Sequence, residues 1–298
     1  MKQTLTLGSV DITRVLEYTG ATRSPQAMFP ELDRATWRAH QDWLTPAFWN
    51  PPTDLLQTCV QTWVLRTADE TILVDTGVGN HKPRPGTPAF DRLDTDFLTR
   101  LLAAGVVPED VTTVVLTHLH ADHVGWNTRL VDGDWVPTFP NATYLLTRAD
   151  FEYWNPAGLG RPRLAAANEG VFDDSIRPVE RAGQLRLWED HFELSRGLRL
   201  EAAPGHTPGS AVLSLESGGD HAVFVGDVLH NPIQIVAPDL SSCFCEDPPA
   251  ATATRRRLLA RAADQHALVF PAHLGGGLAV EVAEAGPGFA VRRWGFER

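Results

Sequence analysis

The chain has 298 residues, of which 43% are hydrophobic, and its formal net charge is -11. The apolar content suffices for a large core, and we expect one layered domain spanning residues 1–298. The acidic charge excludes the basic footprint of a nucleic-acid or anionic-membrane binder, and no stretch approaches a membrane span. These properties predict a protein with no nucleic-acid partner and no membrane partner, and the motifs along the chain indicate the kind of small-molecule partner.

The cysteine pattern predicts a reducing compartment. Cys243 and Cys245 are too close in sequence for an easy disulfide, and with Cys59 the odd count gives no disulfide framework. Residues 1–8 lack the apolar segment of a signal peptide. We therefore expect a cytoplasmic protein.

The N-terminal part of the chain changes character after its first strands. Residues 3–18 predict two short strands around Gly8, whereas residues 19–57 are rich in proline and tryptophan and predict an irregular arm with a short helix near 32–43. Long irregular segments in compact domains are usually functional or form interfaces. We expect this arm to be a lid over a site or a contact in a homodimer, with simple packing as the equal alternative.

The rest of the chain alternates between strand and helix patterns. Strands are predicted at 58–66, 71–75, 111–116, 142–146, 185–188, 198–203, 210–216, 221–225 and 267–270, with a strand pair within 278–294. Helices are predicted at 93–104, at 148–154 and from Asp247-Pro248 onward, where aspartate and proline are typical of a helix start. The arginines of that last helix are expected on its solvated face: Arg255, Arg256, Arg257 and Arg261. Interspersed strands and helices predict an α/β fold with layered sheets.

The string His118-Leu119-His120-Ala121-Asp122-His123 directly follows the predicted strand 111–116. Imidazole and carboxylate ligands together suit zinc, iron, manganese or cobalt. Side-chain alternation places His118 and His120 on one side of an extended segment, and Asp122 and His123 follow as the chain turns into a helix. The group can therefore face two adjacent metals. The alternative is a polar loop that happens to carry three histidines.

Further candidate ligands follow three other predicted strands. His206 lies in A-P-G-H-T-P-G-S, Asp227 in F-V-G-D and His273 in F-P-A-H. Each of these residues alone would more often be an ordinary loop residue. Because loops at one edge of a layered fold converge, the four strand ends together predict one shared site.

The order T-H-x-H-x-D-H, G-H-T-x-G, G-D and H resembles the metallo-β-lactamase superfamily over residues 58–294. The resemblance implies a four-layer αββα sandwich with two metal ions. It implies that His118, His120 and His206 hold one ion, that Asp122, His123 and His273 hold the other, and that Asp227 bridges them. Asp75, in V-D-T-G, matches the first motif of the superfamily, whose aspartate orients the ligands from outside the ligand set.

The resemblance is nearest to acyl-homoserine-lactone lactonases and aryl organophosphate (methyl parathion) hydrolases. Lactamases of this fold lack an aspartate at the place of Asp227, so lactam hydrolysis is not expected. Lactonases often have a tyrosine three residues after that aspartate, where this chain has His230. The pattern G-D-V-L-H looks more like the organophosphate hydrolases.

The implied function is a dinuclear metal-dependent hydrolase of a small ester, lactone or organophosphate. Two divalent ions, zinc first and manganese, iron or cobalt as alternatives, would provide a bridging hydroxide. Asp227 would hold both ions, and Asp122 or His230 would protonate the leaving group, with packing as the alternative role of His230.

Two other readings remain open within the fold and one outside this class. A glyoxalase-type thioesterase and a mononuclear-iron sulfur dioxygenase use the same scaffold. A non-catalytic or RNA-binding member is the third reading, against which the full ligand set and the acidic charge argue.

Aromatic residues near the ligand strings predict the substrate wall. They are Phe48, Trp49, Trp126, Trp154 and Phe244. Aromatic side chains at the mouth of a site suit an acyl or aryl group, although core packing is the commoner role of such residues.

Overall fold

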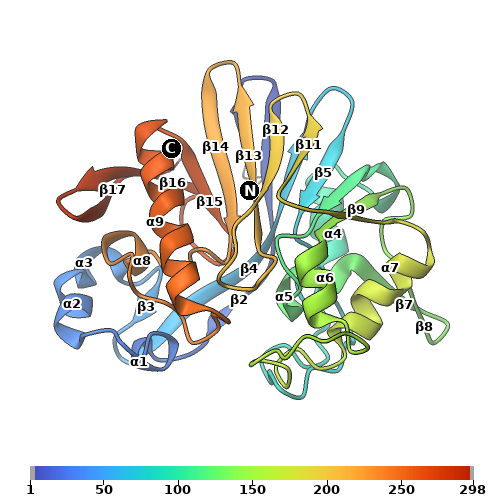
Figure 1. Ribbon diagram of the computed structural model, residues 1–298, viewed down its shortest axis with the longest axis horizontal. Coiled ribbons are helices and arrows are strands. Elements are labelled where there is room, and N and C mark those ends of the chain that lie inside the picture. The colour runs from blue at the N-terminus through green and yellow to red at the C-terminus, as the bar shows by residue number, and fades with distance from the viewer. Residues whose placement is uncertain (1–3, 296–298) are drawn as a thin grey trace.

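The computed structural model describes residues 4–295, in which two β-sheets pack face to face and helices cover both outer faces (Figure 1). In the described chain the first sheet has the order β1-β2-β4-β5-β6-β9-β10, with β3 paired to β4, and the second runs β11 to β17 in sequence order. The predicted four-layer αββα sandwich is confirmed.

The first sheet is antiparallel from β1 to β5 and parallel from β5 to β10. Its strands are β1 (Thr4–Leu7), β2 (Val10–Ala21), β3 (Trp49–Asn50), β4 (Leu55–Arg66), β5 (Thr71–Val74), β6 (Thr113–Val115), β9 (Thr143–Thr147) and β10 (Leu185–Trp188). A separate hairpin is formed by β7 (Thr128–Val131) and β8 (Asp134–Pro137).

The second sheet carries the later ligand strings. Its strands are β11 (His191–Ser195), β12 (Leu198–Ala202), β13 (Ala211–Ser217), β14 (Asp220–Gly226), β15 (Leu268–Pro271), β16 (Ala279–Ala285) and β17 (Gly288–Gly295). All neighbouring strands are antiparallel except β14 and β15.

Helices form the outer layers, with α4, α6 and α7 on the side of the first sheet and α9 on the side of the second (Figure 1). The helices are α1 (Pro25–Met28), α2 (Arg34–Ala39), α3 (Gln41–Leu44), α4 (Phe97–Ala103), α5 (Ala121–Val124), α6 (Arg148–Trp154), α7 (Arg177–Arg181), α8 (Ile233–Val236) and α9 (Pro248–Asp264). As the sequence predicts, Asp247 caps α9: its side chain accepts a hydrogen bond from the backbone N–H of Ala250.

Alternating side chains explain why both faces of the short strand β6 are buried. Val114 packs in the cluster under the outer helices, whereas Val115 packs between the two sheets. Trp63 of β4 joins the sheets at the same level, because its ring meets Phe270 edge-on at 5.1 Å and its Nε1 donates to the Pro271 carbonyl. Because β6 is buried on both faces, its position is fixed, and so is the position at which the string 118–123 begins.

The N-terminal arm is more regular than the sequence suggests. β2 continues to Ala21 and β4 begins at Leu55, because the two strands stay paired as far as Ala21 and Gln57. Between them the chain forms α1, α2 and α3 in place of one helix at 32–43. Gln3, the first residue of the predicted strand pair, lies outside the described residues.

One predicted surface residue is in fact buried. Arg255 of α9 has no exposed surface, and its guanidinium donates hydrogen bonds to the carbonyls of Val228 and Pro238. The expectation of a solvated face is wrong at this position, because an arginine can satisfy buried carbonyls that the strand-to-helix connection leaves unpaired. Val228 directly follows Asp227, so Arg255 supports the chain next to a candidate ligand.

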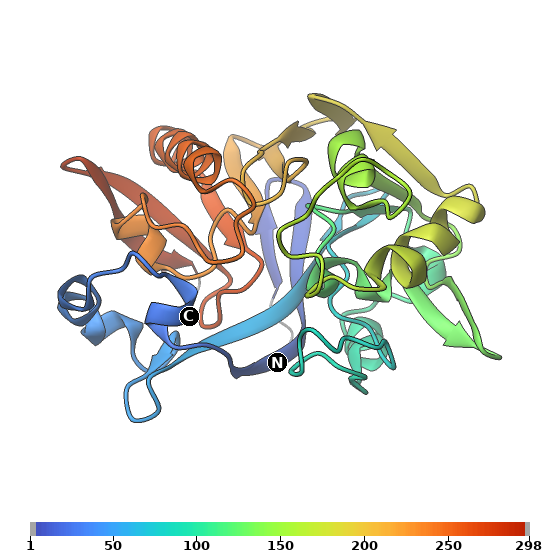
Figure 2. The ribbon, with the colours of Figure 1, turned by 60° about the horizontal axis from the view of Figure 1, so that its bottom comes forward.

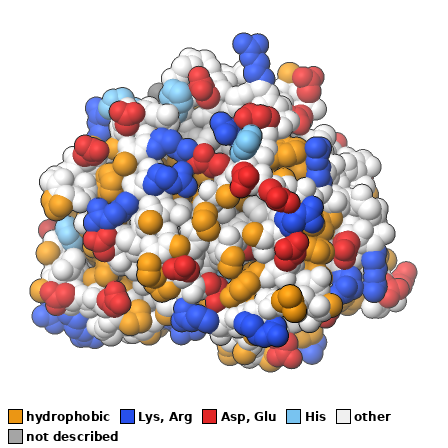
Figure 3. Space-filling model, viewed as in Figure 1, with side chains coloured by type: hydrophobic (Ala, Val, Ile, Leu, Met, Phe, Trp, Pro, Cys, Tyr) orange, Lys and Arg blue, Asp and Glu red, His pale blue; other side chains and the backbone are white. Residues whose placement is uncertain are grey.

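On the face seen in Figure 3, acidic and basic side chains are interspersed. Within residues 4–295, no helix has both the length and the apolarity needed to cross a membrane.

Replacing Arg255 by alanine should destabilise the fold. The change leaves two buried carbonyls unpaired, and each costs roughly 1–3 kcal/mol. We expect the free energy of unfolding of Arg255→Ala, measured with denaturant, to fall by at least about 2 kcal/mol. Arg257 lies two positions away and its side chain is exposed, so Arg257→Ala should lower the free energy of unfolding by less than about 1 kcal/mol. Equal losses in the two variants would contradict this role of Arg255.

Candidate metal centre

The loops that follow β6, β12, β14 and β15 converge at one edge of the sandwich. Figure 2, in which the lower edge of Figure 1 comes forward, shows the two halves facing each other across β2 and β4. The predicted convergence of the four strand ends therefore takes place in the structure.

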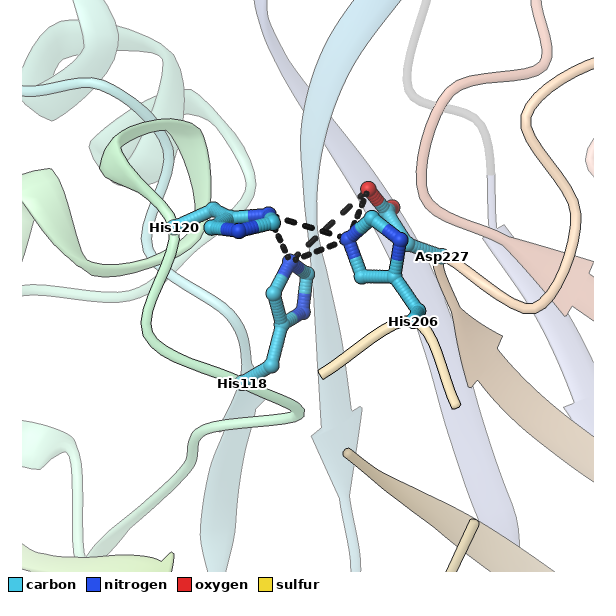
Figure 4. Close-up of side chains that lie close together, drawn as sticks. All are labelled: His118, His120, His206 and Asp227. Carbon is cyan, nitrogen blue, oxygen red and sulfur yellow. Dashed lines mark hydrogen bonds and ion pairs between the residues drawn. The ribbon is translucent and has the colours of Figure 1, made fainter. Parts of the chain in front are cut away.

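Three imidazoles meet at the first group (Figure 4). Nε2 of His118 lies 3.0 Å from Nδ1 of His120, and Nε2 of His206 lies 3.2 Å and 2.9 Å from these two atoms. A tetrahedral ion with metal–nitrogen distances of about 2.0–2.1 Å separates its ligand nitrogens by roughly 3.3 Å. The spacing of the three nitrogens therefore fits one metal ion.

The second group consists of Asp122, His123 and His273, whose candidate ligand atoms lie within 4.8 Å of one another. Nε2 of His273 lies 3.6 Å from Asp122, and Nε2 of His123 lies 3.8 Å from the other oxygen of the same carboxylate. Asp122 and His123 belong to α5, which begins directly after His120. The turn into this helix separates the string into two groups.

Asp227 lies between the two groups. Its Oδ2 is 3.2 Å from Nε2 of His206, and its Oδ1 is 2.9 Å from Nε2 of His273 and 3.3 Å from Nε2 of His123. The preceding Gly226 has a φ of +49°, and a Cβ there would lie 2.7 Å from Oγ1 of Thr117. The glycine thus lets the chain turn so that one carboxylate faces both groups.

Buried polar atoms that make no hydrogen bond at this site also point to bound cations. Nε2 of His123 and Oδ1 of Asp227 are buried and make no hydrogen bond. Burial and the neighbouring His123 lower the pKa of His118 well below its usual value, so its ring is neutral, which is the form that coordinates a metal. Although burial acts to lower it, Asp227 raises the pKa of His206 to about 9. The carboxylate therefore attracts positive charge into the site.

Asp75, at the end of β5, contacts the site from outside the ligand set. Its Oδ1 accepts from the backbone N–H of Thr117, and its Oδ2 accepts from the Thr117 hydroxyl and lies 2.7 Å from Nδ1 of His123. This contact fixes the tautomer of His123 and directs Nε2 toward Asp227. In the same way, Nδ1 of His273 lies 2.9 Å from the Cys59 carbonyl.

Glu17 is a buried residue of this region that sequence reasoning missed. It lies on β2 and accepts hydrogen bonds from the backbone N–H groups of Val78 and Gly79 and from Nε1 of Trp126. These bonds connect the loop after Asp75 to the segment after α5. Burial raises the pKa of Glu17 to about 7, against the opposing effect of the hydrogen bonds. Its position within a strand, rather than after one, gave no signal in the sequence.

Lys82 and Arg84 form a second buried polar group that the sequence did not reveal. Arg84 makes two hydrogen bonds with the carboxylate of Asp174, and Nζ of Lys82 lies 3.3 Å from the same group. All three side chains are almost fully buried. The group anchors the start of the loop 83–90, part of which lines the cavity described next.

A cavity of about 350 Å³ opens over the two groups. Its wall includes the candidate ligands His120, Asp122 and His273 together with His230 and Phe244. The remaining lining residues come from the N-terminal arm, β4, α5 and the loops near 86–90 and 164–168: Ala21, Thr22, Arg23, Met28, Thr58, Val60, Gly86, Thr87, Pro88, Ala89, Phe90, Ala121, Leu164, Ala167 and Asn168. The arm and the two loops thus enclose a mostly apolar space above the histidines.

Of the five aromatic residues expected on the substrate wall, the structure brings only Phe244 to this cavity. Trp126 stacks on Phe97 in the core under the outer helices, and Trp154 packs in the same core, 5.2 Å from the His120 ring. The large apolar surface of these two rings is buried in the core behind the candidate ligands.

Phe48 and Trp49 belong to the core of the arm rather than to its inner face. They pack with α1, α2, α8 and Leu274. This core of the arm is separate from the clusters between the two sheets and under the outer helices. The arm contributes to the cavity instead through Arg23 and Met28, and the Arg23 guanidinium lies 5.0 Å from the centre of the Phe244 ring.

His230 lies beside Asp227 on the cavity wall. Its Nε2 is 3.2 Å from Oδ2 of Asp227 and 3.2 Å from the Ser242 hydroxyl, and its backbone N–H donates to Gln234. Its Nδ1 is buried without a hydrogen-bond partner. The ring is therefore fixed on one side and free of protein partners at one nitrogen.

The comparison with protein families agrees with this geometry. The model of the metallo-beta-lactamase superfamily matches residues 60–273, which is more than half of the chain. The chain belongs to the metallo-β-lactamase superfamily.

Among curated proteins of the superfamily, the chain is similar to an N-acyl homoserine lactonase of Bacillus cereus, with 28% identity over 177 residues, or 56% of this chain. The match covers 62% of that lactonase, so the chain spans less than two thirds of this relative. It is also similar to the N-acyl homoserine lactonase AttM of Azorhizobium caulinodans, with 31% identity over 40% of this chain and 41% of that protein.

Two solved structures match over nearly their whole length. The hydrolase AbOPH of the beta-lactamase superfamily has a TM-score of 0.80 and 25% identity, over 100% of this chain and 98% of that chain. The dizinc quorum-quenching lactonase AidC, solved with its N-hexanoyl-L-homoserine product, has a TM-score of 0.78 and 23% identity over the same shares. The likeness to AidC, at 23% identity, shows a shared fold and nothing further about this chain.

The buried carboxyl of Glu17 should make stability depend on pH. Because its pKa rises from 4.5 to about 7 on folding, its contribution is full below pH 4.5 and is lost as pH rises through 7. We expect the free energy of unfolding of the wild type, relative to that of Glu17→Gln, to fall by about 3 kcal/mol from pH 4.5 to pH 8. Denaturant unfolding across this range measures it, with exposed Glu180→Gln as the control for lost charge. A difference that stays constant with pH would contradict the prediction.

Proposed function

We propose that this protein is a metal-dependent hydrolase with two divalent ions that opens a small lactone, with esters and organophosphates as related substrates. The observation that carries the proposal is the position of Asp227. Its two oxygens face two separate ligand groups at the base of one apolar cavity. The similarity to N-acyl homoserine lactonases supports a lactone substrate.

His118, His120 and His206 would hold one ion, and Asp122, His123 and His273 the other, with Asp227 shared. Zinc suits this donor set, and manganese, iron and cobalt are compatible with it. When bound, the ions would supply Lewis-acid polarisation and would lower the pKa of water to roughly 7.

The side chains of the chain itself provide the remaining chemistry. The apolar wall binds the acyl or aryl part of the substrate and excludes water from it. Asp122 and His230 are the groups on this wall that can transfer a proton to the leaving oxygen. Nδ1 of His230 is buried and makes no hydrogen bond within the protein, so it would be the ring nitrogen that binds a substrate oxygen entering the cavity.

A substrate panel tests the function. We expect the metal-loaded protein to contain two ions per chain and to hydrolyse an N-acyl homoserine lactone or an aryl lactone faster than an aryl ester or an aryl phosphotriester. Asp227→Asn, which removes the shared carboxylate, should lose metal and nearly all turnover. One iron per chain with oxygen uptake would contradict the proposal and favour a sulfur dioxygenase. Cleavage of a glutathione thioester alone would contradict it and favour a thioesterase.

Replacing His230 by phenylalanine separates proton transfer from packing. Phenylalanine keeps the ring but has no nitrogen, so we expect full metal content and a kcat lower by roughly 100-fold. Lactone turnover and metal analysis on the same preparation measure kcat and the metal content. His221→Phe on β14 is a histidine control away from the cavity and should retain the wild-type rate. An unchanged rate in His230→Phe would assign His230 to packing.

A further inference from the structure

Asp150 is a fully buried carboxylate behind the three-histidine group that the proposed chemistry does not use. It lies in the first turn of α6, where Thr147 caps the helix by accepting a hydrogen bond from the Asp150 backbone N–H. Its two oxygens point away from this helix. Oδ2 accepts from the backbone N–H of Leu119 at 2.9 Å, and Oδ1 accepts from the backbone N–H of Gly209 at 2.8 Å.

These two N–H groups belong to the two loops that carry the three histidines. Leu119 lies between His118 and His120, after a strand of the first sheet, and Gly209 lies three residues after His206, in the connection between two strands of the second sheet. One carboxylate thus connects the ligand loops of both sheets. The Leu119 carbonyl is fixed as well, because Nδ2 of Asn168 donates to it at 2.7 Å.

The approach of Gly209 to α6 leaves no room for a side chain. A Cβ on Gly209 would lie 2.2 Å from the backbone nitrogen of Asp150 and 2.3 Å from Oγ1 of Thr147. The hydroxyl of Thr147 also donates to the Gly209 carbonyl at 2.6 Å. The last glycine of G-H-T-P-G is therefore required by contact with this helix, and the loop of His206 is bound to the start of the helix through both the N–H and the carbonyl of Gly209.

We propose that Asp150 is a positioning residue that sets the metal affinity of the three-histidine group by holding its two loops together. Charge-assisted hydrogen bonds that one carboxylate accepts from both loops fix them at the spacing that the histidines need before an ion arrives. Without this connection, part of the binding free energy of the ion would be used to bring the loops together. The proposal rests on the proposed metal centre, but not on its substrate.

Asp150→Asn tests this inference with little change in shape. The amide has one acceptor oxygen, so one of the two backbone N–H groups would face an NH₂ donor instead. The probe is Co²⁺, titrated by calorimetry into chelator-treated protein. The background His123→Ala/His273→Ala leaves the three-histidine group, and the background His118→Ala/His206→Ala leaves the other.

We expect Asp150→Asn to weaken Co²⁺ binding at the three-histidine group by about 10- to 100-fold and to leave the other group unchanged. Asn168→Ala, which removes the second hydrogen bond on Leu119, should weaken the same group by about tenfold, and it keeps the test available should Asp150→Asn not fold. Asp174→Asn is the matched control, because Asp174 is also a buried aspartate but contacts neither ligand loop. It should lower the thermal stability without changing Co²⁺ affinity.

Unchanged affinity in Asp150→Asn and Asn168→Ala would overturn the proposal while leaving the metal centre intact. Equal weakening in Asp174→Asn would also overturn it, because general destabilisation would then explain the loss. Failure of the otherwise wild-type protein to bind Co²⁺ would overturn the metal centre together with this inference.

Discussion

Asp227 lies buried among five imidazoles, and its two oxygens approach different ones. Burial by itself would raise the pKa of this carboxyl, but His273, His123 and the other rings lower it well below its usual range. A buried charge requires partners at close range. The rest of the site can be understood from this requirement, because the ligand loops of both sheets must come close enough to surround one side chain.

Other buried carboxylates keep these loops in place. Asp75 joins the loop of His118 to His123, Asp150 joins it to the loop of His206, and Glu17 joins the loop after Asp75 to the segment after α5. In each case the acceptor oxygens meet backbone or side-chain donors of two separate segments. Irregular loops have many unpaired N–H groups, and one carboxylate can satisfy two of them. The geometry of the candidate ligands therefore depends on side chains that are not part of the cavity wall.

Most of the cavity wall comes from segments other than the loops that carry the candidate ligands. The arm between β2 and β4 has its own aromatic core, and it presents Arg23 and Met28 to the space above the histidines. The loop 86–90 faces it and is anchored by the buried Asp174 group. The candidate ligands and most of the cavity wall thus come from separate segments, and such walls can differ in shape without disturbing the candidate ligands.

The convergence of the candidate ligand strings was predictable, because each string follows a buried strand and strand ends at one edge of layered sheets lie close together. Local sequence also determined the start of α9 and predicted layered sheets, whereas the order αββα was implied by the resemblance to the superfamily. The tertiary structure alone decided which aromatic rings face the cavity. Trp126 and Phe244 both lie near candidate ligands in the sequence, but Trp126 packs in the core behind them and Phe244 lines the cavity. It likewise decided that Arg255 is buried and that Asp150 connects two sheets. Those roles depend on unpaired backbone groups of segments distant in sequence, and only packing brings these groups within hydrogen-bond reach.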